Sequence, residues 1–190
     1  TLWVKVIDVK AIGPEGSAVG FAAINGAVSE MLGYRAFFYK LAEILGLLIL
    51  AIAAGTAMIG AYQLFQGKSL KAVDDQILIL GAYYAVVFLL YILFEKIPLN
   101  YRPVILDAAE GLEPSYPSSH TMLAICVIGP ALKLADSYIG NEKHRNVAKI
   151  GLIVLGTVTV AARLLSGAHW ITDILGAVLI SFSLVTAYLT

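Results

Sequence analysis

The sequence predicts an all-α fold, a polytopic bundle of transmembrane helices. Of the 190 residues, 59% are hydrophobic and only 14% are charged, which is far from the composition of a soluble domain. The apolar residues also fall in five long runs, each close to the ~20 residues that a helix needs to cross a bilayer. No linker, repeat or low-complexity tract divides the chain, so we expect one membrane-embedded domain over 1–190.

The five expected spans form a helical core over 39–190 and cover residues 39–66, 74–95, 118–136, 147–166 and 169–190. Before them, residues 18–36 are interrupted by glycine and mixed in polarity, so we expect an interfacial or re-entrant helix within an external segment 1–38. The first residues resemble the end of an apolar segment. We therefore expect a sixth span before Thr1 in the full protein.

The loops between the spans predict the orientation of the protein. Lysine and arginine concentrate in the connections 67–73 and 137–146, which the positive-inside rule places in the cytoplasm. The loop 96–117 and the turn 166–168 then lie together on the extracytoplasmic face of the cell membrane. The net charge of zero gives no sign of a nucleic-acid partner, and nothing in the sequence indicates an oligomeric state.

A first polar motif stands at the start of the third expected span, in "EPSYPSSHTM", residues 113–122. Pro117 suits the first turn of a helix. The N–H groups of Ser118, Ser119 and His120 would then lack partners within the helix and lie at the positive end of its dipole. Such a helix start can bind an anion. Ordinary capping by a serine is the alternative, and it is common for Pro-Ser-Ser alone.

A second motif, "ARLLSGAHWITD", covers residues 162–173. His169 and Asp173 are four residues apart and share one helical face. The carboxylate can accept a hydrogen bond from one ring nitrogen and leave the other as a free lone pair, as an oriented nucleophile or base requires. A structural His–Asp pair between two helices is the alternative. We interpret Trp170 as an anchor at the membrane interface.

Three cations share the same predicted face of the membrane: Lys96, Arg102 and Arg163. Guanidinium groups match the geometry of phosphate oxygens, and a lysine supplies a point charge. Each cation alone could also be a residue that reaches to the headgroups. We interpret the acidic residues of loop 96–117 as a solvated face: Asp107, Glu110 and Glu113.

Together these motifs resemble the signature of the type 2 phosphatidic acid phosphatase superfamily: Lys-x6-Arg-Pro, then Pro-Ser-Gly-His, then Ser-Arg-x5-His-x3-Asp. The counterparts are "KIPLNYRP" at 96–103, "PSSH" at 117–120 and the motif at 162–173. The chain departs from the pattern at three positions. Lys96 is one residue closer to its arginine, Ser119 replaces a glycine and Ala162 replaces a serine. None of these changes removes a nucleophile or a proton donor.

The resemblance implies an integral membrane lipid phosphatase that hydrolyses a phosphomonoester or diphosphate headgroup, without metal or cofactor, through a phosphohistidine. It implies that His169 attacks phosphorus, that Asp173 orients it and that His120 protonates the leaving oxygen. The implied phosphate ligands are Lys96, Arg102, Ser118, Ser119 and Arg163. A bacterial lipid phosphate such as phosphatidic acid, phosphatidylglycerol phosphate or undecaprenyl diphosphate is the expected substrate.

Other classes of function remain open at this stage. A catalytically degenerate protein that binds anionic lipid or scaffolds a partner would keep the site without turnover, and the altered lysine spacing and Ser119 favour it. A transporter would place its polar residues near the middle of the bilayer, whereas here they gather at one face. A serine hydrolase built on Ser118 and His120 lacks an evident acidic partner.

Overall fold

The computed structural model describes residues 2–190, and within them it contains six α-helices and no β-strand. The helices are α1 Ala22–Leu32, α2 Ala36–Gly67, α3 Asp75–Lys96, α4 Ser119–Tyr138, α5 Glu142–Leu165 and α6 Ile171–Leu189. Short 3₁₀ helices cover Leu2–Lys5, Pro14–Gly16 and Leu70–Ala72. The prediction of an all-α fold is confirmed.

Five of these helices, α2 to α6, are long and apolar enough to cross a membrane, and each overlaps one of the expected spans. The largest difference is at the start of α5, which begins at Glu142 rather than 147. Asn141 explains it, because its side chain accepts a hydrogen bond from the His144 N–H and caps the helix. The polar residues of the expected loop therefore form the first turns of α5.

Helix α4 is the centre of the bundle and packs against α2, α3, α5 and α6. Small side chains let its neighbours approach closely, as is usual between helices in a membrane. Gly129 of α4 lies against Val185, and Gly156 of α5 lies against Ile128. The outer surfaces of α2, α3 and α5 remain apolar and exposed, which suits contact with lipid tails.

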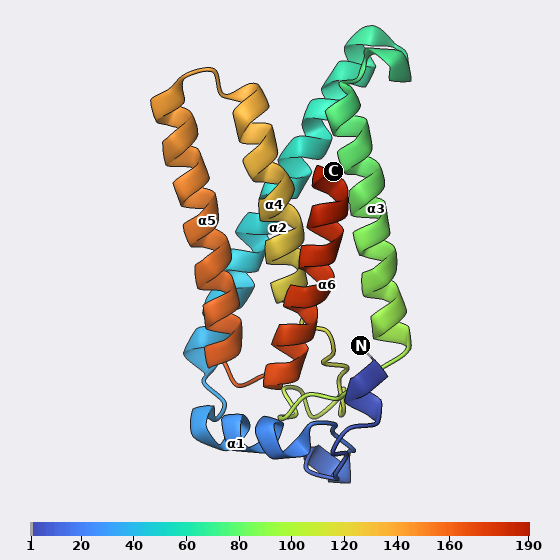
Figure 1. The fold of residues 1–190 in the computed structure, drawn as a ribbon, viewed down its shortest axis with the longest axis vertical. Helices are drawn as coiled ribbons and strands as arrows, with labels where there is room; N and C mark the ends of the chain where they lie inside the picture. Colours follow the sequence, from blue (N-terminus) through green and yellow to red (C-terminus); the bar gives the residue numbers. More distant parts are fainter. Residues whose placement is uncertain (1) are drawn as a thin grey trace.

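Helix α1 lies across one end of the bundle, beside the loop 97–118 and the turn that joins α5 to α6 (Figure 1). The Asn25 side chain donates to Thr172 Oγ1 at 2.9 Å and accepts from the Thr172 N–H at 3.2 Å. The Arg35 N–H also donates to the Ser166 carbonyl. The Asn25 bonds fix α1 to the first turn of α6, and the Arg35 bond joins the start of α2 to the end of α5. The connections 68–74 and 139–141 lie at the opposite end.

Candidate active site

The loop between α3 and α4 folds back on itself and carries two groups of the site. Ser115 donates its N–H to the Asn100 carbonyl at 2.9 Å, and Arg102 donates its N–H to the Glu113 carbonyl at 3.0 Å. This pairing fixes the positions of the Arg102 guanidinium and the Ser115 carbonyl. Both lie beside His169, in the turn before α6.

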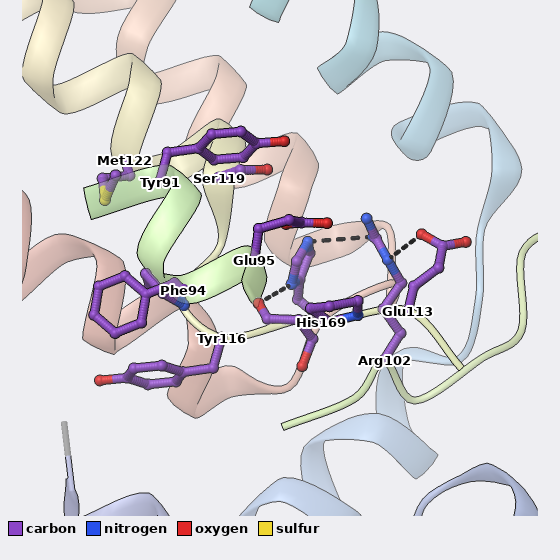
Figure 2. Close-up of a pocket in the computed structure, with 12 residues that line it drawn as sticks. Tyr91, Phe94, Glu95, Arg102, Glu113, Tyr116, Ser119, Met122 and His169 are labelled. Carbon is purple, nitrogen blue, oxygen red and sulfur yellow. Dashed lines mark hydrogen bonds and ion pairs between the residues drawn. The ribbon is translucent and has the colours of Figure 1, made fainter. Parts of the chain in front are cut away.

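The ring of His169 is held at both nitrogens (Figure 2). Nδ1 lies 3.0 Å from the Ser115 carbonyl oxygen, and Nε2 lies 3.4 Å from Arg102 Nη1. Because a carbonyl oxygen can only accept a hydrogen bond, the proton belongs on Nδ1. Nε2 is left with a lone pair, next to a cation that can bind an anion. This tautomer is the one that a histidine nucleophile needs.

The surroundings of His169 also keep it neutral. The residue is 6% exposed. Burial, followed by the nearby Arg163 and Arg102 guanidinium groups, holds the pKa of His169 well below its ordinary value of 6.5. At neutral pH the imidazole is therefore uncharged, and its lone pair is available for attack.

Asp173 joins three parts of the site. Its Oδ2 accepts from the Trp170 N–H at 3.0 Å, its Oδ1 accepts from Asn100 Nδ2 at 3.3 Å, and its carbonyl accepts from the Ser118 N–H at 3.1 Å. Oδ2 lies 3.6 Å from His169 Nδ1, so the Ser115 carbonyl is the nearer partner of the ring. Asp173 therefore has two roles: it fixes the start of α6, and it lies close to the histidine.

Two expectations about this region are wrong. The Ser118 N–H is not free to bind an anion, because the Asp173 carbonyl accepts it, and Ser118 itself is fully buried. Trp170 is not an interface anchor, because it is 3% exposed and its indole N–H donates to the Tyr101 carbonyl at 2.7 Å. In both cases the loop 97–118 packs on the turn before α6 and buries groups that we expected at a surface.

A cavity of about 100 Å³ opens beside His169. Arg102, Ser119 and two carboxylates, Glu95 and Glu113, contribute to its wall (Figure 2). Glu113 lies 2.8 Å from Arg102 Nε, so the interpretation of Glu113 as part of a solvated acidic face is wrong. Ser119, the first residue of α4, faces the cavity from a helix N-terminus, where its N–H lacks a partner within the helix.

His120 and Arg163 meet at a residue that the sequence analysis missed. Glu43 Oε1 lies 3.1 Å from Arg163 Nη1 and 3.4 Å from His120 Nε2. The Arg163 side chain is 1% exposed and stacks on Tyr39, with 4.9 Å between the guanidinium carbon and the ring centroid. Glu43 did have a signal in the sequence, because it is an acidic residue inside the apolar run of α2, where ionisable groups are costly and usually functional.

Like Ser118, Lys96 is an expected phosphate ligand that the structure does not present to the cavity. It is exposed at the last residue of α3 and does not contribute to the wall of the cavity beside His169. A cation at the C-terminal end of a helix interacts favourably with the negative end of the helix dipole. Its neighbour Glu95 faces the cavity instead (Figure 2).

An apolar groove of about 460 Å³ runs between α2, α3 and α4 and adjoins the polar cavity. Tyr91, Ser119 and Met122 line both spaces. Apart from His120 and Ser119, the lining of the groove is apolar or aromatic, as at Val87 and Phe88. The site therefore combines a charged end with an apolar approach from the side of the bundle.

Comparison with known proteins places this arrangement in a family. A family model described as the PAP2 superfamily matches residues 76–190, from α3 to the end of α6. A similar fold is seen in the crystal structure of a transmembrane PAP2-type phosphatidylglycerolphosphate phosphatase from Bacillus subtilis. It has a TM-score of 0.63 and 21% identity, covering 87% of this chain and 83% of that one. No curated protein matches the chain. The chain belongs to the PAP2, or type 2 phosphatidic acid phosphatase, superfamily and is a multi-pass membrane protein.

Proposed function

We propose that this protein is a membrane lipid phosphatase that releases phosphate through a phosphohistidine on His169, without a metal ion. The observation that carries the proposal is the state of the His169 ring. The Ser115 carbonyl holds the proton on Nδ1, burial and two arginines keep the ring neutral, and Nε2 lies against Arg102 beside the cavity. A nucleophile, its orienting group and an anion-binding cation thus occur together.

The first step of the proposed reaction transfers the phosphoryl group to the enzyme. Arg102, Arg163 and the N–H at Ser119 bind the phosphate oxygens as charge builds up on them. His169 Nε2 forms a bond to phosphorus while the bond from phosphorus to the lipid oxygen breaks. His120 starts the step as the imidazolium and gives its Nε2 proton to that leaving oxygen, so the lipid departs as an alcohol and the ring becomes neutral.

The second step returns the enzyme to its starting state. Water attacks phosphorus and transfers a proton to His120 as the bond between phosphorus and Nε2 of His169 breaks. Inorganic phosphate leaves, and both histidines regain their original protonation. No metal is required in this scheme, because the arginines supply the positive charge. Within residues 2–190, no group of three or more His, Cys, Asp or Glu side chains is placed to hold a metal ion.

The apolar groove supports an amphiphilic substrate. A phosphate headgroup in the polar cavity would leave its acyl or prenyl tail along the groove between α2, α3 and α4. Phosphatidic acid, phosphatidylglycerol phosphate and undecaprenyl diphosphate all have this form. The name of the Bacillus subtilis protein makes phosphatidylglycerol phosphate the first to test.

We propose an extracytoplasmic position for the site. Lys68 and Lys71 follow α2, and Lys143 and Arg145 lie in the first turn of α5, all at the end opposite the site. Such short basic connections face the cytoplasm in most membrane proteins. A cysteine introduced in place of Glu110 should react with a membrane-impermeant thiol reagent in intact cells, and one in place of Lys143 should not.

Phosphate release by the detergent-purified protein tests the proposal. Wild type and His169→Ala are compared on phosphatidic acid, phosphatidylglycerol phosphate and a polyprenyl diphosphate, with EDTA present. We expect release by wild type alone. Folded wild type that binds these lipids but releases no phosphate would favour an anionic-lipid-binding or scaffold protein instead. Activity that EDTA abolishes and a divalent cation restores would exclude the metal-independent mechanism.

A further inference from the structure

Glu43 is the unexpected member of the site, and its contacts differ from those of an ordinary ion pair. A single oxygen, Oε1, faces both Arg163 Nη1 and His120 Nε2, at 3.1 Å and 3.4 Å. The Glu43 side chain is 42% exposed, while the guanidinium beside it is buried. A carboxylate needed only to neutralise the arginine has no reason to contact the histidine as well.

Helix α2 is shaped around the same edge of the His120 ring. Gly46 lies one turn after Glu43, and a Cβ at that position would be 2.7 Å from His120 Cδ2 and 3.1 Å from Nε2. A glycine is therefore required for the ring to approach the helix this closely. The carboxylate and the glycine together determine where Nε2 lies.

The two nitrogens of His120 have different surroundings. Nδ1 is buried and has no hydrogen-bond partner among the described residues, whereas Nε2 faces the Glu43 carboxylate. An ionised carboxylate can only accept a hydrogen bond, so it favours a proton on Nε2, and its negative charge favours the doubly protonated ring that a general acid requires. Among the described contacts of His120, this carboxylate is the group that stabilises the charged form.

We infer that Glu43 is a positioning residue that stabilises the protonated, imidazolium form of His120 and holds its Nε2–H beside the phosphate-binding Arg163. This inference rests on the proposed function, in which His120 protonates the leaving oxygen. The first step starts from the imidazolium: its Nε2 proton moves to the lipid oxygen as the phosphorus–oxygen bond breaks, and a neutral ring with its proton on Nδ1 remains. Water returns it to Nε2 in the second step, and Glu43 remains a carboxylate throughout.

The Glu43→Gln variant tests this role because it keeps the size of the side chain but removes the charge. The glutamine oxygen can still accept from Arg163, whereas the neutral side chain no longer supplies the negative charge that stabilises the His120 imidazolium. General acid catalysis contributes about 10²- to 10⁴-fold to rate. We expect a fall in kcat of about 10²-fold on dioctanoyl phosphatidic acid, whose alcohol leaves only when protonated, and no rise in KM.

The leaving group separates this role from a structural one. On p-nitrophenyl phosphate, whose phenolate leaves without a proton, Glu43→Gln should retain kcat to within about threefold. Glu30→Gln is the matched control, since it removes an exposed carboxylate at the same end of the chain, and it should behave as wild type on both substrates. Thermal unfolding of each variant confirms that it is folded.

Three results would overturn the inference. Equal loss on both substrates with a raised KM would make Glu43 only a structural partner of Arg163. If Glu43→Gln had wild-type rates on both substrates, Glu43 would have no role in the reaction. If Glu43→Gln turned over the lipid faster than wild type, the carboxylate would be competing with the substrate phosphate. A wild type inactive on both substrates is instead a failure of the proposed function. In that case ¹⁵N NMR still tests the inference, because the His120 ring should stay protonated at both nitrogens up to a higher pH in wild type than in Glu43→Gln.

Discussion

The close approach of His120 to helix α2 makes Gly46→Ala a sensitive probe of the site. The added Cβ would lie 2.7 Å from His120 Cδ2, whereas ordinary van der Waals contact begins at 3.4 Å. The ring must therefore move by about 0.7 Å. Displacement of a catalytic group by ~1 Å can cost on the order of 10²-fold in rate, so we expect kcat to fall by about 10- to 100-fold.

The fold should survive this substitution. Alanine is favoured over glycine in a helix interior by ~1 kcal/mol, so the change adds intrinsic helix stability to α2. Gly55→Ala is the matched control, because it lies in the same helix and its added Cβ would meet no atom within 4 Å. Both variants should elute and unfold like wild type, and only Gly46→Ala should be slow in phosphate release.

The assay is steady-state phosphate release from a lipid phosphate in detergent, with protein folding checked by thermal unfolding. If folded Gly46→Ala retains kcat within twofold of wild type, then either His120 takes no part in the rate-limiting step or its position is not critical. Either conclusion would refute the reasoning that α2 positions this histidine. Equal slowing in Gly55→Ala would show that the effect comes from the helix as a whole.

Three further predictions concern other parts of the site. Because the pKa of His169 is lowered, ¹⁵N NMR of the histidines should show its ring neutral at pH 6.5 and protonated only at lower pH; half-protonation at or above pH 6.5 would contradict this. Asn25→Ala leaves the Thr172 N–H without its partner, so the free energy of unfolding should fall by about 1–3 kcal/mol. An unchanged denaturant midpoint would show that the contact between α1 and α6 does not stabilise the fold. Arg102→Lys keeps the charge but loses the planar group that contacts both His169 and Glu113, so kcat/KM should fall by at least about tenfold; a rate equal to wild type would mean that charge alone suffices.

The fold was largely predictable from the sequence because the membrane imposes a simple rule. A helix that crosses a bilayer must be long and apolar, and all five such runs became helices close to their expected bounds. The start of α5 was harder to predict, because polar residues form its first turns and a single capping side chain, Asn141, determines where they begin.

The site was predictable where the chemistry depends on side chains and obscure where it depends on the main chain. His169, Asp173 and Arg102 were identified from residue type and spacing, and the structure brings them together. The carbonyl of Ser115, which holds the His169 proton, has no sequence signal, because every residue has a carbonyl. Glu43 had a signal, and it was missed because it lies outside the motifs.

Direct detection of the intermediate tests the central proposal, that His169 carries the phosphoryl group on Nε2. His120→Ala protein is mixed with ³²P-labelled p-nitrophenyl phosphate. This substrate needs no proton donor to form the intermediate, and the variant lacks the base that hydrolyses the intermediate. The protein is then denatured in alkali and digested, and the labelled peptide is sequenced by mass spectrometry. We predict an acid-labile, alkali-stable label on Nε2 of His169 that is absent when His169 is also replaced by alanine. Label on another residue, or phosphate release by the variant without any labelled protein, would contradict a phosphohistidine at this position.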